Sequence, residues 1–370
     1  MHKLTAFQTV AYDTVIHDSG MPHYFNDTEF FDVFYSLVLR NDADVIDVGF
    51  NIGIQTELLL GITSGKSFGF EASKKIYDYS VEKFNDNDRI QLFNCAISNV
   101  EGTADFIDTE TWGAASLQYT AGMDHCNVGD GYSRVSVELA IIDNALNNEL
   151  NIGLIKLDIE GAEILALDGA RQLIQRNRPF IVMEYCHNAL SFEFRNKKIT
   201  SETLFHYAKE INYKVYNIYG ICLSNIEVWN TSIFKDTADV FLIPDELHEY
   251  WATELLPKYQ YKIYDKILEA IEFSSKPNNY FMLTSLPSRI YEVINTKPID
   301  KCLEYIKIIE VKLHNLIKNR KSIFTTGKLT RRGEVLLALI YEGKADIAYQ
   351  LGSMREVTID DLVSFESFLN

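Results

Sequence analysis

The sequence is poor in the features that build disulfide frameworks, cysteine metal sites and membrane spans. Its five cysteines are scattered and form no C-x-x-C pair, which argues against a disulfide framework and against a cysteine zinc site. No apolar run approaches the ~18 residues of a membrane helix, and residues 1–15 lack the apolar core of a signal peptide. We therefore predict a cytoplasmic protein without a transmembrane segment.

The chain also has few positively charged residues relative to acidic ones over most of its length. The 370 residues carry 35 Lys and Arg against 52 Asp and Glu, a formal net charge of −17. This balance disfavours nonspecific binding to the phosphates of nucleic acids. The deficit is uneven: residues 1–250 carry −19 and residues 251–370 carry +2. The change near residue 250, which Pro244 and Pro257 bracket, indicates a domain boundary.

What the sequence has instead is a 47% hydrophobic composition and an alternation of strand and helix patterns. Amphipathic helices between strands of β-branched and aromatic residues indicate βαβ units. The fold class is therefore α/β, with a doubly wound, mostly parallel sheet of seven strands and a closing antiparallel pair. The expected strands are 44–50, 67–72, 90–97, 151–159, 179–185, 213–220 and 239–244. The expected helices are 30–39, 54–60, 76–84, 162–176 and 200–211.

Three regions follow from these patterns. Residues 1–40 form a β-prone segment and a first helix, and residues 41–248 form the α/β domain. Residues 249–370 contain amphipathic helices without strands, and we expect them to form a C-terminal helical appendage. One of its segments, ALIYEGKADIAYQL, resembles half of a tetratricopeptide unit, but no second copy is visible.

The strongest motif is a glycine loop between the first α/β strand and the next helix. Gly49 and Gly53 would let the backbone approach a ligand, and the N–H groups that open the helix point at the same space. Asp47 precedes the loop and Asn51 lies within it. Glu71 ends the next strand, where a carboxylate can accept hydrogen bonds from ribose hydroxyls.

Two ligands compete for this loop. A dinucleotide site requires G-x-G-x-x-G, but here the pattern is G-x-N-x-G, with Ile54 in place of the third glycine. The carboxylate of Asp47 also suits an anionic pyrophosphate poorly. It suits S-adenosylmethionine (SAM), whose sulfonium and ammonium groups are cationic. A structural glycine turn without a ligand is the third interpretation.

Four blocks of sequence, in this order, are similar to those of one family. They are DVGFNIG at 47–53, FEA at 70–72, NCAIS with EG at 94–102, and KLDIEGAE with LDGA at 156–170. Over about residues 40–190 the chain resembles the FkbM-type SAM-dependent methyltransferases, although Ala72 stands where the family has proline. The resemblance implies a class I methyltransferase-like fold, SAM as methyl donor and transfer to a hydroxyl of a sugar, glycan or other secondary metabolite.

The resemblance also implies roles for individual residues. Glu71 should hold the ribose, and the turn from Asn94 to Ala96 should lie by the adenine. Asn94 could equally cap a turn at its strand end. The methionine part of SAM should be surrounded by Asp47, Gly49, Asn51 and Gly53.

A hydroxyl acceptor needs a base, or a metal that lowers its pKa. Asp158 follows the fourth strand, Glu184 ends the fifth, and His187 comes three residues later. The ends of these strands meet at the edge of the sheet where ligands bind. We predict that Glu184 is the general base, and that Asp158 positions SAM or the acceptor, with capping of the next helix as its alternative role. His187 is either a partner of Glu184 or a solvated loop residue. Because no ligand spacing supports it, we predict no metal.

The segment 109–134 is long and rich in glycine, which favours a substrate loop or lid. Within it, Trp112 could stack on a sugar or simply pack, and the stretch with Ser116 looks like the family's G-x-S-S-L segment. Residues 312–332 carry seven Lys and Arg and no acid. This basic segment is either a solvated surface or a contact with an anionic acceptor or membrane surface.

Other functions remain in competition with O-methylation. None of the seven prolines forms a [DN]-P-P-Y motif or a P-C nucleophile, which argues against nucleic-acid base methylation. Methylation of another small molecule or of a protein stays open. A non-catalytic SAM-fold binding module is the alternative of a different class, and the complete loop from Asp47 to Gly53 argues against it. The sequence leaves the oligomeric state open.

Overall fold

The computed structural model describes residues 28–263 and 364, apart from 110–114, 116, 118–131, 148, 187–192, 219, 227 and 230–236. The chain divides into two compact units, Phe31–Leu255 and Met1–Phe30 with Leu256–Asn370. The α/β domain belongs to the first. The predicted helical appendage lies almost entirely outside the described residues, and the basic segment 312–332 lies wholly outside them. The predicted site residues Trp112, Ser116 and His187 lie outside them as well.

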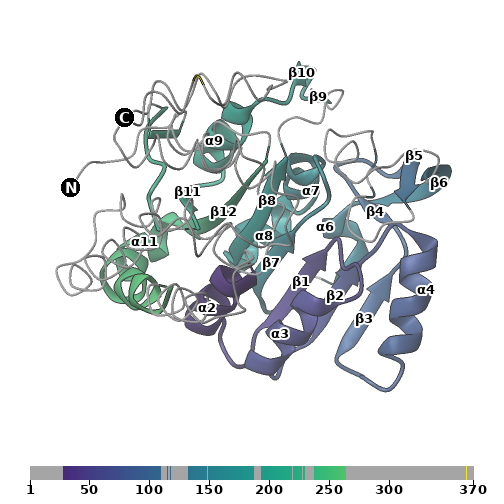
Figure 1. Ribbon diagram of the computed structural model, residues 1–370, viewed down its shortest axis with the longest axis horizontal. Coiled ribbons are helices and arrows are strands. Elements are labelled where there is room, and N and C mark those ends of the chain that lie inside the picture. The colour runs from purple at the N-terminus through teal and green to yellow at the C-terminus, as the bar shows by residue number, and fades with distance from the viewer. Residues whose placement is uncertain are drawn as a thin grey trace. The chain divides into compact units, whose positions relative to one another are not determined.

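The centre of the first unit is a seven-stranded sheet with the order β11-β12-β8-β7-β1-β2-β3 (Figure 1). All neighbours are parallel except β12, which is antiparallel to both β8 and β11. This confirms the predicted fold class, including the closing antiparallel pair. The strands are β1 (Asp44–Val48), β2 (Ser67–Phe70), β3 (Ile90–Phe93), β7 (Ile152–Leu157), β8 (Phe180–Cys186), β11 (Tyr213–Asn217) and β12 (Thr237–Pro244). The strand order reverses between β1 and β7, which is where ligands bind in open α/β sheets.

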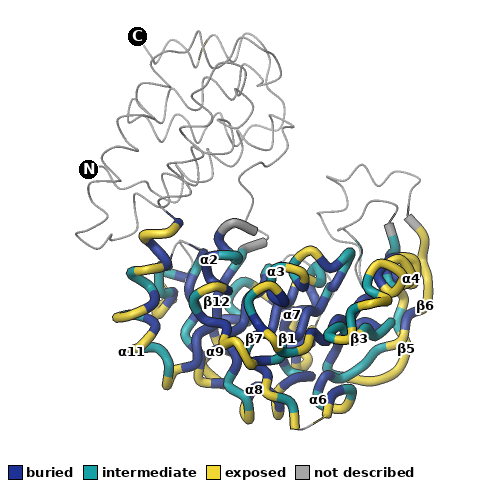
Figure 2. Tube along the Cα trace, turned by 90° about the horizontal axis from the view of Figure 1, so that it is seen from below, coloured by how far each residue is buried: buried dark blue, intermediate teal, exposed yellow. Residues whose placement is uncertain are grey.

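A second sheet of three strands lies beside the first and was not predicted. It consists of β4 (Ala96–Ile97), β6 (Tyr132–Ala140) and β5 (Gly102–Thr109), in that order. Figure 2 shows long exposed stretches on β5 and β6. The predicted strand 90–97 is accordingly two strands, β3 and β4. The alternation of Val135, Val137 and Leu139 with polar residues is the signal that could have identified β6.

Helices cover both faces of the main sheet. They include α2 (Thr28–Val38), α3 (Ile54–Ile62), α4 (Lys74–Lys83), α7 (Glu163–Gly169), α8 (Arg171–Asn177) and α9 (Ser201–Glu210). The helix predicted over 162–176 is two helices, because the carboxylate of Asp143 accepts the N–H groups of Gln172 and Leu173 and starts a new helix there. No helix among the described residues is long and apolar enough to cross a bilayer.

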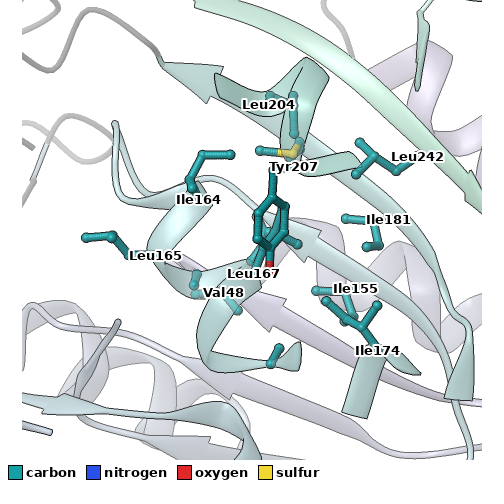
Figure 3. Close-up of a cluster of buried hydrophobic side chains, with 14 of the residues drawn as sticks. Val48, Ile155, Ile164, Leu165, Leu167, Ile174, Ile181, Leu204, Tyr207 and Leu242 are labelled. Carbon is teal, nitrogen blue, oxygen red and sulfur yellow. The ribbon is translucent and has the colours of Figure 1, made fainter. Parts of the chain in front are cut away.

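The two faces of the sheet differ in chemistry near its carboxyl edge. One face carries Ile155, Ile181 and Leu242 in register, and they belong to the apolar core with α7, α8 and α9 (Figure 3). The opposite face carries Phe241, on which Phe34 of α2 stacks at 4.0 Å between ring centroids. Towards the carboxyl edge this second face becomes polar, and it contains the candidate site.

Candidate functional site

The glycine loop connects β1 to α3 through three left-handed residues, with φ values of 77° at Gly49, 50° at Asn51 and 78° at Gly53. A Cβ at Gly49 would lie 1.9 Å from the carbonyl oxygen of Asp158, and one at Gly53 would lie 2.5 Å from the ring of Phe84. Contacts inside the protein therefore require both glycines, whereas the sequence suggested that they make room for a ligand. A substitution at Gly49 would therefore disturb the fold, so its effect on cofactor binding would not report contact with the cofactor.

Glu71 joins the loop to the end of β2. Its Oε2 accepts the N–H of Asn51 at 2.8 Å, and its Oε1 accepts the N–H of Ser73 at 2.8 Å. Burial raises the pKa of Glu71, and these two hydrogen bonds act against that rise. Each carboxylate oxygen of Glu71 can still accept one further hydrogen bond, from a ligand.

Asn51 is the second polar group of this wall. Its backbone oxygen accepts the hydroxyl of Ser80 at 2.7 Å. Its side-chain Oδ1 is buried and has no hydrogen-bond partner among the described residues. A buried acceptor without a partner is costly, so this oxygen suits a ligand that brings a donor.

The turn predicted to lie by the adenine contains one residue with a structural role and two that line the pocket. Asn94 donates from Nδ2 to the backbone oxygens of Glu71 and Ala72, at 2.9 and 3.3 Å, and so ties the end of β3 to the end of β2. It does not line the pocket, whereas Ala96 and its neighbour Cys95 do. These contacts favour the turn-capping interpretation of Asn94.

A pocket opens at the carboxyl edge of β1, β2 and β7. Its wall contains Gly49, Asn51, Glu71, Ala96 and Asp158 of the predicted site residues, while Asp47, Gly53, Asn94 and Glu184 lie outside the lining. The rest of the wall is largely apolar and includes side chains that the sequence did not single out. These are Val48, Phe70, Ala72, Ile76, Cys95, Ile97, Phe106, Ala115, Leu117, Ile159, Glu160 and Ala162.

Asp47 lies beneath the loop and is completely buried. Its Oδ2 accepts the hydroxyl of Thr56 at 2.8 Å, and its Oδ1 makes only an ion pair, 3.3 Å from Nζ of Lys156. Burial raises the pKa of Asp47, and Lys156 opposes that rise. The contacts of Asp47 thus hold the floor of the loop, whereas the sequence suggested direct contact with the cofactor.

Lys156 is the functional residue that the sequence analysis did not assign. Its Nζ donates to the carbonyl oxygen of Gly49 at 2.9 Å and lies 3.4 Å from Oδ2 of Asp158. Burial alone would lower the pKa of Lys156, but Asp47 and Asp158 raise it above its usual value, so the ammonium stays charged. A single lysine inside the apolar strand IGLIKL is the signal that could have indicated this role.

Three carboxylates lie together at the carboxyl ends of β7 and β8. Asp158, Glu160 and Glu184 each have one carboxylate oxygen that lies within 4.8 Å of the corresponding oxygens of the other two. Asp158 and Glu160 line the pocket, and Glu184 hydrogen-bonds to Asp158. Burial, followed by the charges of Asp158 and Asp239, raises the pKa of Glu184 well above its usual value. A carboxylate of raised basicity beside the pocket can take a proton from an acceptor.

Glu163 opens α7 and is fully buried, although its Oε1 accepts the N–H of Gly161 at 2.8 Å. Burial raises its pKa to about 8, and the charges of Glu160 and Asp158 act in the same direction. Between pH 4.5 and 8 the folded protein therefore holds a proton there that the unfolded chain releases, so stability falls as pH rises through this window.

We expect Glu163→Gln to remove this fall in stability between pH 4.5 and 8. The free energy of unfolding of the wild type should fall relative to the variant by up to about 1.4 kcal/mol per pH unit in this window. Urea unfolding of both proteins at pH 5.5 and pH 8 in metal-free buffer measures the difference. The same difference at both pH values would mean that Glu163 stays ionised in the folded protein.

Residues 47–216 match the family described as Methyltransferase FkbM domain. Among curated protein sequences, none matches this chain. The order of the seven strands, with the pocket at the switch point, is that of the class I methyltransferase-like fold. Residues 47–216 are thus similar to the methyltransferase domain of the FkbM family.

Several solved structures are similar to part of this chain. Methyltransferase FkbM from Methylobacillus flagellatus KT is 16% identical, with a TM-score of 0.34, and the match covers 64% of this chain and 57% of that one. An rRNA methylase from Streptococcus thermophilus is 10% identical (TM-score 0.32; 60% and 99% covered). The plantazolicin methyltransferase BpumL, in complex with a pentazolic desmethylPZN analog and SAH, is 11% identical (TM-score 0.31; 59% and 83% covered).

The pocket fits SAM in three respects. The carboxylate of Glu71 has acceptor directions left for two ribose hydroxyls. The partnerless Oδ1 of Asn51 can accept a hydrogen bond from an ammonium group. Cys95, Ala96 and Ile76 supply an apolar wall of the kind that a purine ring needs.

Proposed function

We propose that this domain transfers the methyl group of SAM to a hydroxyl of a sugar, a glycan or another secondary metabolite. The observation that carries the proposal is the pair of Asp158 and Glu184, hydrogen-bonded to each other where the cofactor pocket meets the carboxyl edge of the sheet. An amine would arrive with its own lone pair once neutral, whereas a hydroxyl benefits from a proton acceptor in the transition state.

Bound SAM supplies an electrophilic methyl group on a sulfonium. The hydroxyl oxygen of the acceptor would take this methyl group, and the sulfur would keep the electron pair of the carbon–sulfur bond. With both carboxyls ionised, Glu184 takes the hydroxyl proton and then donates it in the hydrogen bond to Asp158, which lines the pocket and positions the acceptor. Glu71 and Asn51 hold the cofactor in line, which is the larger part of the task in such a displacement.

Three predicted residues extend the proposal to the acceptor. Trp112 and Ser116 lie in the sequence between β5 and β6, and His187 directly follows β8. In the first of these segments Ala115 and Leu117 line the pocket, and Glu184 of β8 is hydrogen-bonded to Asp158 of the pocket wall. We assign Trp112 and Ser116 to acceptor binding, and His187 to a partner of Glu184.

Glu71→Gln should weaken SAM binding by about 1.5–3 kcal/mol, because the neutral amide accepts a poorer hydrogen bond from ribose and must turn its NH₂ towards one backbone N–H. Isothermal calorimetry measures the dissociation constant. Asp105→Asn on β5, an exposed carboxylate beside the pocket residue Phe106, is the matched control and should bind as the wild type does. Equal affinity of the Glu71 variant would place the ribose elsewhere.

The function itself is tested with methyl-labelled SAM. Purified full-length protein is incubated with panels of monosaccharides, glycans and hydroxylated aromatic metabolites, and the label is located by mass spectrometry and NMR. Label on an acceptor oxygen supports the proposal. Label on nitrogen or on a protein would contradict O-methylation. SAM binding with no transfer to any panel would instead favour a binding module.

A further inference from the structure

The polar face of the main sheet carries charged residues on four adjacent strands. Asp47 of β1 pairs with Lys156 of β7, and Asp239 of β12 pairs with Glu184 of β8. Lys156 is in register with Val182, two residues before Glu184, so all these side chains share one face. Asp158 joins them, since its carboxylate lies 3.4 Å from Nζ of Lys156. Lys156 is engaged by Asp47, by Asp158 and by the carbonyl oxygen of Gly49.

The acids form a compact cluster at one end of this face. Asp158, Glu160 and Glu184 can each place an oxygen within 4.8 Å of the others, which is the spacing of ligands around one small cation. Asp158 is half exposed, while Glu184 is mostly enclosed, so the cluster has an open and a closed side. Glu160 has a φ of 55°, and this left-handed conformation belongs to the turn that places it on the pocket wall.

An independent observation comes from helix α2. Tyr35 is completely buried, and its hydroxyl has no hydrogen-bond partner in the described part of the chain. Its helix lies on this same face, where the neighbouring Phe34 stacks on Phe241. The carboxylates of Asp47, Asp158 and Asp239 are the charges that act on the phenol. A buried donor left without a partner beside the cluster suits a water molecule held there by a cation.

We propose that Asp158, Glu160 and Glu184 bind a divalent cation of the Mg²⁺ or Mn²⁺ type, with Tyr35 oriented towards its water shell. Three carboxylate oxygens and no nitrogen or sulfur form a ligand set for hard cations. Such a set leaves positions for water and for one incoming oxygen.

The proposal deepens the proposed function, on which its catalytic part rests. Asp158 and Glu160 line the SAM pocket, so the cation would lie where the acceptor hydroxyl has to arrive. Contact with the cation would lower the pKa of that hydroxyl and fix its direction. Binding of the cation itself does not depend on which acceptor the enzyme uses.

The competing explanation is a cluster that shares protons. In that case Glu184 stays protonated, donates to Asp158 and needs no ion. The two explanations differ in one measurable respect, because only a cation site binds Mn²⁺ stoichiometrically and competitively with Mg²⁺.

The test uses the full-length protein after treatment with a chelator. Mn²⁺ is titrated in, and free Mn²⁺ is measured by electron paramagnetic resonance. We expect one ion per chain, displaced by Mg²⁺. Glu184→Gln and Asp158→Asn should each weaken binding more than tenfold, and Tyr35→Phe should weaken it several-fold. Glu82→Gln, an exposed carboxylate on α4, is the matched control and should bind as the wild type does.

Unfolding temperatures separate loss of the ion from loss of the fold. In chelator, Glu184→Gln should be at least as stable as the wild type, since it removes one of several crowded carboxylates. Absence of stoichiometric Mn²⁺ binding, or equal affinity in the wild type and Glu184→Gln, overturns the proposal. Failure of the proposed function is distinguishable, because it would appear as SAM and Mn²⁺ binding without methyl transfer to any hydroxyl.

Discussion

Glu184→Gln is expected to lower kcat by about 10²–10⁴-fold, the usual cost of removing a positioned base. Glutamine keeps the size of the side chain and its hydrogen bond to Asp158, but it cannot take a proton at neutral pH. SAM affinity should stay within about threefold, because Glu184 lies outside the pocket lining. Initial rates at saturating acceptor and calorimetric SAM titration measure the two quantities separately.

The rate of the variant with and without added Mg²⁺ distinguishes three roles of Glu184, namely a general base, a cation ligand and a structural residue. If Glu184 acts only as a base, added Mg²⁺ leaves the variant's kcat low. If it acts as a cation ligand, high Mg²⁺ restores part of the lost rate. Glu82→Gln should turn over as the wild type does. An unchanged kcat in Glu184→Gln would make Glu184 structural and pass the proton-accepting role to Asp158.

The main sheet could be predicted because each of its strands carries a strong local signal. Runs such as DVIDV and PFIVMEY are largely buried on both faces, and their β-branched and aromatic residues identify them without reference to neighbouring strands. The second sheet has no such signal. β5 and β6 are exposed on one side, and the alternation in Gly102–Thr109 is broken by adjacent Phe106 and Ile107, both buried.

The candidate site was predictable where chain position alone fixes a residue's place. Glu71 and Asp158 end parallel strands, so both had to meet at one edge of the sheet. Position in the chain does not determine which side chains contact one another across the sheet or between the sheet and its helices. Asp47 looks like a ligand contact in the motif, yet its neighbours across the sheet and on α3 are Lys156 and Thr56. Tyr35 lies far upstream, and only the packing of α2 brings it to this face.

Lys156→Met is expected to cost about 3–5 kcal/mol of stability, because it leaves the buried carboxylate of Asp47 without its cation. Methionine fills a similar volume, so the loss reports charge more than packing. The substitution also removes the hydrogen bond from Nζ to the carbonyl of Gly49, which should loosen the glycine loop and weaken SAM binding. Urea unfolding and calorimetric SAM titration measure the two effects.

A double-mutant cycle with Asp47→Asn shows whether the two residues act as a pair. Asp47→Asn should cost less than Lys156→Met, since Lys156 keeps its contacts with Asp158 and Gly49. The double variant has no unpaired buried charge, so it should be more stable than Lys156→Met alone, with a coupling of at least about 1 kcal/mol. Lys74→Met, which breaks an exposed pair with Asp78 on α4, is the control and should cost about 0–1 kcal/mol. Additive losses in the cycle would mean that Lys156 supports the loop through Gly49 and not through Asp47.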